Sequence, residues 1–189
     1  MRTPSNPLIQ RTQKAAPLIN SLAVKMCTRE NKTEEIYALI GRAHRACQRF
    51  EYALAEALYE WRIHSCPHRP LGPIEAVEEI NKIQKCTFEN TVLGRTITTL
   101  QKDNILEEDI IKLLTKFKNQ RNDFIHDFHY GHGIELMLIE GNFERGTFNE
   151  EHVMAAFCKL KTDLNEFIHN MENAVSLSKS IVNAILKLR

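Results

Sequence analysis

The stretch KNQRNDFIHDF, residues 118–128, lies late in a segment over 106–130 whose pattern predicts an α-helix. Apolar residues recur in this segment at the three- and four-residue steps of a helix that buries one face, and they are Ile110, Leu114, Phe117, Phe124 and Phe128. Arg121 falls on this apolar stripe. Because a buried arginine stays charged, its position predicts a carboxylate partner, a polar cleft or a subunit boundary beside it.

Two further polar side chains accompany this arginine. Asn122 and His126 lie four residues apart, so they project together from a face of the helix next to the apolar stripe. The segment therefore carries a guanidinium, an amide and an imidazole on neighbouring turns, beside a hydrophobic surface. This combination of side chains suits phosphate chemistry, and Arg121, Asn122 and His126 are the candidate catalytic residues.

Composition indicates one compact, mostly helical domain without a bulk charge. The chain has 189 residues, 43% of them apolar, with seven glycines and a net charge of +1. A balanced charge excludes general electrostatic attraction to nucleic acid or acidic membranes, so any such binding must be local. No apolar run approaches the roughly 18 residues of a membrane span. Five scattered cysteines without a Cys-x-x-Cys pair or a preceding secretory signal predict reduced thiols and a cytoplasmic protein.

The first 30 residues differ in composition from the rest. They contain Pro4, Pro7 and Pro17, and five basic residues precede the first acid, Glu30. A targeting sequence would also be basic, but three prolines disfavour the amphipathic helix that such a sequence needs. We expect a flexible basic arm over 1–30, with at most a short helix over 18–26, and a helical bundle domain over 31–189.

The remaining helices follow from their start signals and apolar spacing. A long helix is expected from Thr33 to about Ile63, a short one from Pro73, and another over 91–100. The long helix should bury a stripe of apolar residues, and these are Ile36, Leu39, Ile40, Ala43, Cys47, Phe50, Leu54, Leu58 and Trp61. Asn104 with Glu107 forms a capping box for the helix over 106–130, glycines 131 and 133 end that helix, and Asn149 caps the last one. No strand pattern appears, so the prediction is an all-α fold, an up-and-down bundle of four to five helices.

Other clusters have two readings each. Arg42, Arg45 and Arg49 form a row on the first helix that is either a solvated face or, together with Lys118, a groove for a nucleic-acid backbone. The run His64-Ser-Cys66-Pro-His68 resembles a metal site, but its ligands are too close and too few for zinc. His126, His129 and His132 also repeat, but the glycines that follow break the helix that would align them. We therefore expect no metal and no cofactor.

The order of residues resembles the HEPN superfamily, named for higher eukaryotes and prokaryotes nucleotide-binding. The resemblance rests on Arg121, four residues and then His126, with Asn122 directly after the arginine, late in a bundle helix. The preceding stretches over 91–94 and 96–100, and Phe50-Glu51-Tyr52 late in the first helix, are similar too, so the resemblance covers roughly residues 33–128.

The resemblance implies an all-helical, homodimeric, metal-independent ribonuclease of a toxin–antitoxin, phage-defence or RNA-processing system. Cleavage by the 2′-hydroxyl needs an acid, a base and a cation at the phosphorane, and an imidazole can serve as acid or base near neutral pH. One chain supplies one such histidine, so two copies would complete the site. Arg121 would hold the phosphate, His126 would transfer a proton, and Asn122 would orient the phosphate or the imidazole.

Two alternatives stay open. The motif can be structural, with Arg121 paired to a carboxylate such as Glu51 or Glu56 and His126 a satisfied polar residue. The chain can also be a HEPN-type module that binds a nucleotide or a partner protein without hydrolysis. One HEPN toxin group has a tyrosine two residues after the histidine, where its antitoxin modifies it, whereas this chain has Phe128 there and Tyr130 two places later.

Overall fold

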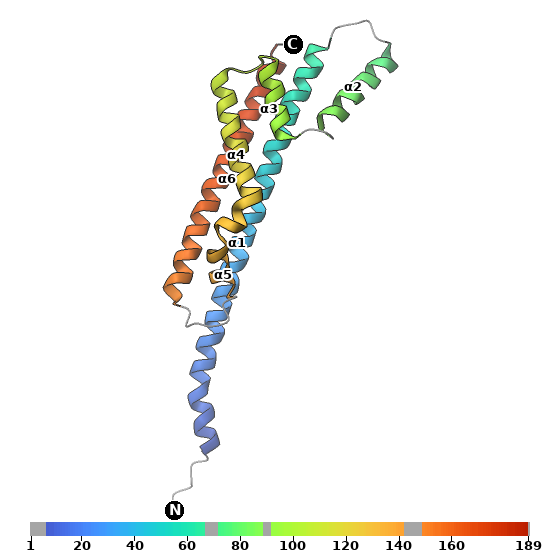
Figure 1. The fold of residues 1–189 in the computed structure, drawn as a ribbon. Coiled ribbons are helices and arrows are strands. Elements are labelled where there is room, and N and C mark those ends of the chain that lie inside the picture. Colours follow the sequence, from blue (N-terminus) through green and yellow to red (C-terminus); the bar gives the residue numbers. More distant parts are fainter. Residues whose placement is uncertain (1–6, 67–71, 89–91, 142–148, 189) are drawn as a thin grey trace, which may run out of the picture. The chain divides into compact units, whose positions relative to one another are not determined.

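The computed structural model describes residues 7–66, 72–88, 92–141 and 149–188, with side chains from residue 30 onward. These residues form six α-helices and no strand (Figure 1). The helices are α1 (Pro7–Ser65), α2 (Pro73–Phe88), α3 (Leu93–Lys102), α4 (Glu108–Gly131), α5 (Gly133–Glu140) and α6 (Glu150–Leu186). The predicted all-α class is confirmed.

The chain divides into two compact units, and the prediction of one helical bundle domain over 31–189 stays a prediction. The first unit comprises Met1–Leu39 and His132–Lys161, and the second comprises Ile40–Gly131 and Thr162–Arg189. The long helices α1 and α6 contribute to both units, because each is longer than the partners that pack on any one part of it. Residues 118–128 and their neighbours belong to the second unit.

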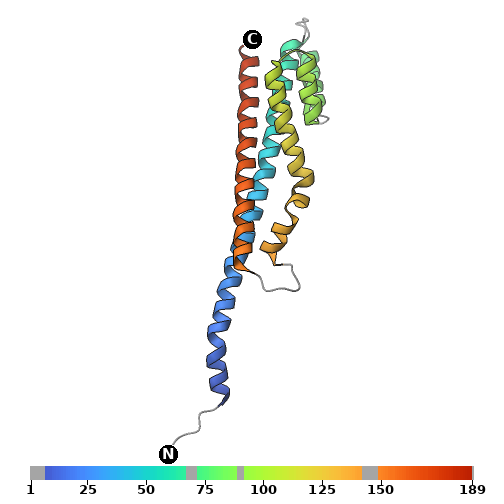
Figure 2. The same ribbon diagram turned by 60° about the vertical axis from the view of Figure 1, so that its left-hand side comes forward.

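In the second unit, α4 runs antiparallel to α1 and lies beside α1 and α6 in both views (Figures 1 and 2). Phe50 of α1 meets Phe117 of α4 with ring centroids 6.3 Å apart, and His44 meets Phe124 at 5.1 Å. Lower numbers on α1 therefore pair with higher numbers on α4. Phe124 also stacks on Phe167 of α6 at 4.4 Å. This alternation of direction is that of an up-and-down bundle.

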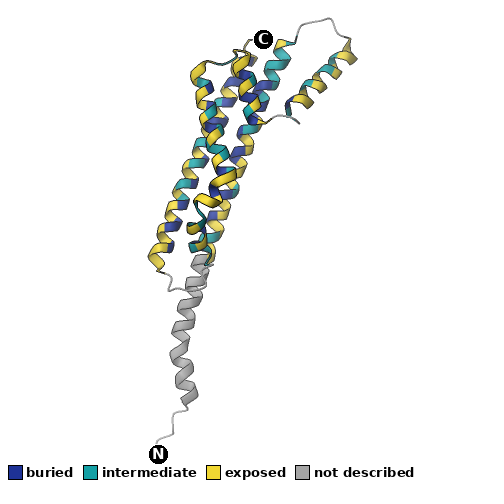
Figure 3. Cartoon of the chain, in the orientation of Figure 1, coloured by how far each residue is buried: buried dark blue, intermediate teal, exposed yellow. Residues whose placement is uncertain are grey.

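Apolar residues at helical spacing form the core of this unit (Figure 3). The buried stripe predicted for α1 is present at Ile40, Ala43, Cys47, Phe50, Leu54 and Leu58. On α4, Leu114, Phe117, Phe124 and Phe128 are buried as predicted, whereas Ile111 is buried and Ile110 is only half-buried. This pattern follows the 3.6-residue period of an α-helix, so the sequence predicts which face of each helix is buried.

The C-terminal end of the short helix α2 packs against α1. Buried Thr87 accepts a hydrogen bond from Arg62 Nη1 at 2.8 Å and donates one to the Ile83 carbonyl at 2.7 Å. Phe88 lies against Tyr52, with ring centroids 5.4 Å apart. The other end of α2 exposes its apolar side chains, and these are Ile74, Val77 and Ile80.

The first unit is held by contacts between α1, α5 and the start of α6. Thr33 Oγ1 donates to the Ile139 carbonyl at 3.4 Å, and the Tyr37 hydroxyl bonds to the Glu140 carboxylate. The hydrogen bond with Glu140 raises the pKa of Tyr37 above its ordinary value. Lys161 pairs with Glu35 at 2.6 Å. These contacts are mostly exposed. Polar pairs at the surface therefore hold the helices of this unit together around a core that is smaller than that of the second unit.

Several predicted helix ends need correction. Helix α1 begins at Pro7, not at Thr33, so most of the segment predicted as a flexible arm over 1–30 is helical, and residues 1–6 lie outside the described part. Proline suits a first helical position, and the residues that follow Pro7 are mostly good helix formers, so Pro17 alone does not end the helix.

The described residues form six helices, whereas four to five were predicted. Helix α4 ends at Gly131 as expected, but α5 follows at once because residues 134–139 are apolar enough to pack as a further short helix.

The capping box predicted for α4 is wrong. Asn104 sits in a turn with a positive φ of 51°, and α4 starts one residue after Glu107, whose carbonyl accepts the Ile111 amide at 3.1 Å. The cap at Asn149 is confirmed, since its Oδ1 accepts the Glu151 amide at 3.0 Å.

Candidate functional site

Arg121 of α4 lies against α1, with 23% of its side chain exposed. Its Nη2 forms an ion pair with the Glu51 carboxylate of α1, and its Nη1 donates to Asn122 Oδ1 at 3.0 Å. Of the three surroundings predicted for Arg121, a carboxylate partner, a polar cleft or a subunit boundary, the structure shows the first, and the partner is Glu51. A guanidinium, a carboxylate and an amide form one polar cluster at the edge of the core.

The register between α1 and α4 creates this cluster. His44, Cys47 and Glu51 follow one another at helical spacing along the side of α1 that meets α4. His44 contacts Phe124, one turn after Arg121, and Phe50 contacts Phe117, one turn before it. Glu51 is thereby fixed opposite Arg121, in the row of apolar contacts that holds the two helices together.

Cys47 lies next to this ion pair and is fully buried. Burial raises the pKa of the Cys47 thiol to about 11, the Arg121 guanidinium opposes the rise, and the Glu51 carboxylate adds to it. The thiol is therefore protonated near neutral pH and does not act as a nucleophile. The sequence indicated that Cys47 is in the core but not that it adjoins Arg121. Its four-residue spacing from Glu51, which places both side chains on one face of α1, is the signal that could have shown this.

The ion pair does not saturate Arg121. A guanidinium has five N–H donors, and the contacts with Glu51 and Asn122 use one hydrogen on each terminal nitrogen. Within the described chain, the buried Nε has no hydrogen-bond partner. Because Nε is buried, an anion that binds Arg121 alongside Glu51 would have to use the remaining hydrogens of the two terminal nitrogens.

His126 faces solvent on the next turn of α4. It is five positions after Arg121, which places the two side chains roughly 140° apart around the helix axis. Asn122, half-buried, is only about 40° from His126 by the same geometry. The structure thus joins Asn122 to Arg121, but in one copy of the chain the imidazole points away from the guanidinium.

Lys118 packs under α3 and is half-buried. A Cβ added to Gly94 would lie 3.9 Å from Lys118 Cδ, an ordinary van der Waals distance, so the lysine stem lies against α3 at Gly94. Helix α3 begins at Leu93, and its first turn therefore covers α4 at Lys118. The face of α4 that follows, with Asn122 and His126, extends past this end of α3.

The arginine row on α1 is not part of the polar cluster. Arg42, Arg45 and Arg49 are exposed, as a solvated face would be. Arg49 lies two residues before Glu51, which puts it roughly 160° away around the helix. Because Glu51 faces α4, the arginine row faces away from α4, and the structure does not bring these three predicted nucleic-acid contacts together with Arg121.

Among the residues that the structure describes, the histidine clusters noted in the sequence do not form a metal site. His64 and Cys66 are half-buried at the end of α1, while His68 lies outside the described residues. In the described part of the chain, no group of three or more His, Cys, Asp or Glu side chains is arranged to hold a metal ion. The same part contains no helix that is both long and apolar enough to cross a membrane.

The polar residues of α4 include anion-binding groups and an imidazole, but these groups project from the helix in two different directions. Arg121 and Asn122 supply hydrogen-bond donors at the edge of the core, and His126 supplies a solvent-facing acid or base. Comparison of the chain with protein-family models, with curated proteins and with solved structures finds no match.

Proposed function

We propose that the chain is a metal-independent endoribonuclease whose active site is shared between two copies of the chain. The observation that supports this most is the partly exposed guanidinium of Arg121, bonded to Asn122 and followed by solvent-facing His126 on a bundle helix. These residues have the order and the helical context of the Arg-x4-His motif of HEPN ribonucleases. The proposed setting is a cytoplasmic toxin–antitoxin, phage-defence or RNA-processing system, with a cognate antitoxin or regulatory protein as a further partner.

The proposed reaction is attack of the RNA 2′-hydroxyl on the adjacent phosphate. One His126 removes the proton from the 2′-hydroxyl, and the His126 of the second copy donates a proton to the leaving 5′-oxygen. Arg121 stabilises the negative charge of the phosphorane with its remaining N–H donors. Asn122, which already accepts a hydrogen bond from Arg121, holds the guanidinium in place and orients the phosphate.

A dimer is the first expected result. Arg121 and His126 point about 140° apart on one helix, so the His126 imidazole of the same chain is poorly placed to share a phosphate with the Arg121 guanidinium. The His126 imidazole of a second copy can approach that guanidinium more readily. Light scattering coupled to size exclusion should give twice the mass of one chain at micromolar concentration. A monomer throughout the range in which RNA is cleaved would remove the composite site.

Cleavage should survive removal of divalent metal ions. The proposed chemistry uses side chains alone, so EDTA should leave the rate unchanged, and the products should end in a 2′,3′-cyclic phosphate. Mass spectrometry of the cleaved oligonucleotide identifies that end. Loss of activity in EDTA that a divalent ion restores would indicate a different mechanism.

A non-catalytic binding module is the second candidate, and the ion pair between Arg121 and Glu51 favours it. A guanidinium held by a carboxylate on a neighbouring helix also serves as a structural contact. In that case the chain would keep the HEPN-type fold to bind a nucleotide or a partner protein, without hydrolysis.

Glu51→Gln tests whether Arg121 binds phosphate or serves only as a structural contact. If Arg121 binds phosphate, loss of the nearby negative charge should tighten RNA binding by up to about fivefold, the equivalent of about 1 kcal/mol. Fluorescence anisotropy with a labelled RNA at low salt measures this change. Glu56→Gln, on the same helix and also half-buried, is the matched control. A lower melting temperature for Glu51→Gln with no change in RNA binding would support the structural role.

A further inference from the structure

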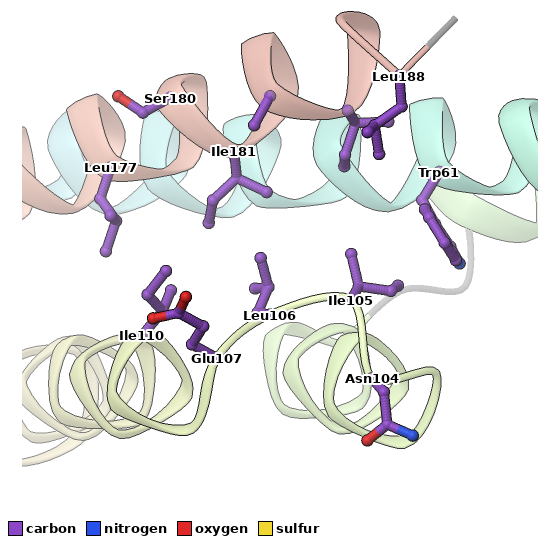
Figure 4. A pocket seen from close by; sticks show the side chains of 12 residues that line it. Trp61, Asn104, Ile105, Leu106, Glu107, Ile110, Leu177, Ser180, Ile181 and Leu188 are labelled. Carbon is purple, nitrogen blue, oxygen red and sulfur yellow. The ribbon is translucent and has the colours of Figure 1, made fainter.

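A second feature of the Ile40–Gly131 and Thr162–Arg189 unit is an apolar cavity of about 540 Å³. It lies between the C-terminal end of α1, the connection from α3 to α4 and the last turns of α6 (Figure 4). Its volume is within the range of roughly 300–1,000 Å³ that is typical of small-molecule sites in proteins. The cavity is independent of Arg121 and of the proposed nuclease activity.

The cavity exists because the connection from α3 to α4 only partly fills the space beside α6. Asn104 reverses the chain with a positive φ of 51°, and Ile105 and Leu106 follow it into the cavity wall, both half-buried. Across from them, Trp61 was predicted to belong to the buried stripe of α1 but is also half-buried. Apolar surface that the fold leaves partly wet is the surface that a bound apolar group would cover.

One charged side chain lines this apolar space. Among the twelve lining residues, all of them described, Glu107 alone carries a charge. Figure 4 shows its carboxylate directed from the start of α4 towards α6, beside Ile110 and opposite Leu177. A single carboxylate at the edge of an apolar cavity is complementary to a ligand with one cationic end.

The geometry points to a binding site for amphipathic amines, with the apolar body of the ligand between Trp61 and Ile181 and its ammonium group beside Glu107. The N-terminus of α4 has a partial positive charge, which would attract an anion. The full negative charge of Glu107 stands at that same end of α4 and outweighs it. The site therefore selects an ammonium over a neutral or an acidic group of the same shape.

Trp61 provides a direct test, because it is the one tryptophan in the sequence. Three probes share one apolar body and differ in one end group: phenylbutylamine, phenylbutanol and phenylbutyrate. Each is titrated into the full-length chain while tryptophan emission is recorded. The amine should give a saturable change and bind about threefold more tightly than the alcohol, as expected for one exposed ion pair, and the carboxylate should bind most weakly.

Three variants locate the binding. Ala184→Phe fills the cavity from an exposed position of α6 and should abolish saturable binding. Asn183→Phe places the same side chain on the neighbouring exposed position, which does not line the cavity, and should bind like the unaltered chain. Glu107→Gln should make the amine and the alcohol equal in affinity. Circular dichroism verifies that each variant keeps its helical content.

Four outcomes would overturn the assignment. They are no saturable change with the amine, equal binding of all three probes, tighter binding of the carboxylate, or equal loss of binding in Ala184→Phe and Asn183→Phe. The last outcome would mean that the probe binds elsewhere on the surface. Because none of these readouts involves RNA, they are unaffected by whether the chain cleaves it.

Discussion

Replacing His126 by alanine is expected to lower single-turnover RNA cleavage by about 100-fold or more, which is the usual contribution of a positioned acid or base. His126 is exposed on α4, so its removal leaves no cavity in the core. Folding and dimerisation should therefore be unchanged by circular dichroism and light scattering. Arg121→Ala should reduce cleavage to a similar extent, because the phosphorane loses its cation.

His129→Ala is the matched control for this experiment. His129 is also exposed, lies one turn further along α4, and contacts Phe128 edge-on at 5.7 Å. Its replacement should change cleavage little. If His126→Ala instead lowers the melting temperature and leaves the activity per folded molecule nearly unchanged, His126 is structural and the binding-module function becomes the better proposal.

A large loss of stability is expected for Phe124→Ala. Phe124 is 7% exposed and contacts rings on three helices, namely His44 on α1, Phe128 on α4 and Phe167 on α6. Truncation removes these contacts and opens a cavity at the centre of the bundle. The free energy of unfolding should fall by about 3–5 kcal/mol in urea denaturation followed by circular dichroism.

Ile125→Ala is the matched comparison for Phe124→Ala. Ile125 is the next residue of the same helix and is only half-buried, so its truncation should cost about 1 kcal/mol. Equal losses for the two variants would contradict the packing of Phe124 between α1 and α6. The comparison also tests the register of α1 against α4, because His44 contacts Phe124 only in that register.

The sequence predicted helix interiors better than helix ends. The stripe from Leu114 to Phe128 and the cap at Asn149 depend on residues close together in the chain, so local rules were sufficient. The start of α4 depends on how the chain leaves α3. Asn104 has a side chain that is common at helix caps, but in the turn after α3 it adopts a left-handed conformation. It therefore does not cap α4, whose first turn begins directly after Glu107.

The candidate site was predictable in its chemistry but not in its partner. A charged arginine on an apolar stripe requires an anion, whichever fold surrounds it. The choice of Glu51 over Glu56 depends on the antiparallel register that Phe50 and Phe117 set between α1 and α4, far apart in the chain. The half-buried state of Trp61 has a similar cause, because spacing along α1 cannot show that the opposite wall is incomplete.

The one-sided attachment of α2 has a consequence for local unfolding. Buried Thr87 and its bond to Arg62 fix the last turns of α2, while Ile74 and Val77 at the other end are exposed. Opening the first turns of α2 therefore breaks few tertiary contacts and needs little free energy. Backbone amides near Pro73 should exchange with deuterium early, and those near Thr87 should exchange only when the α1 contact is lost, so one short helix contains two classes of protection.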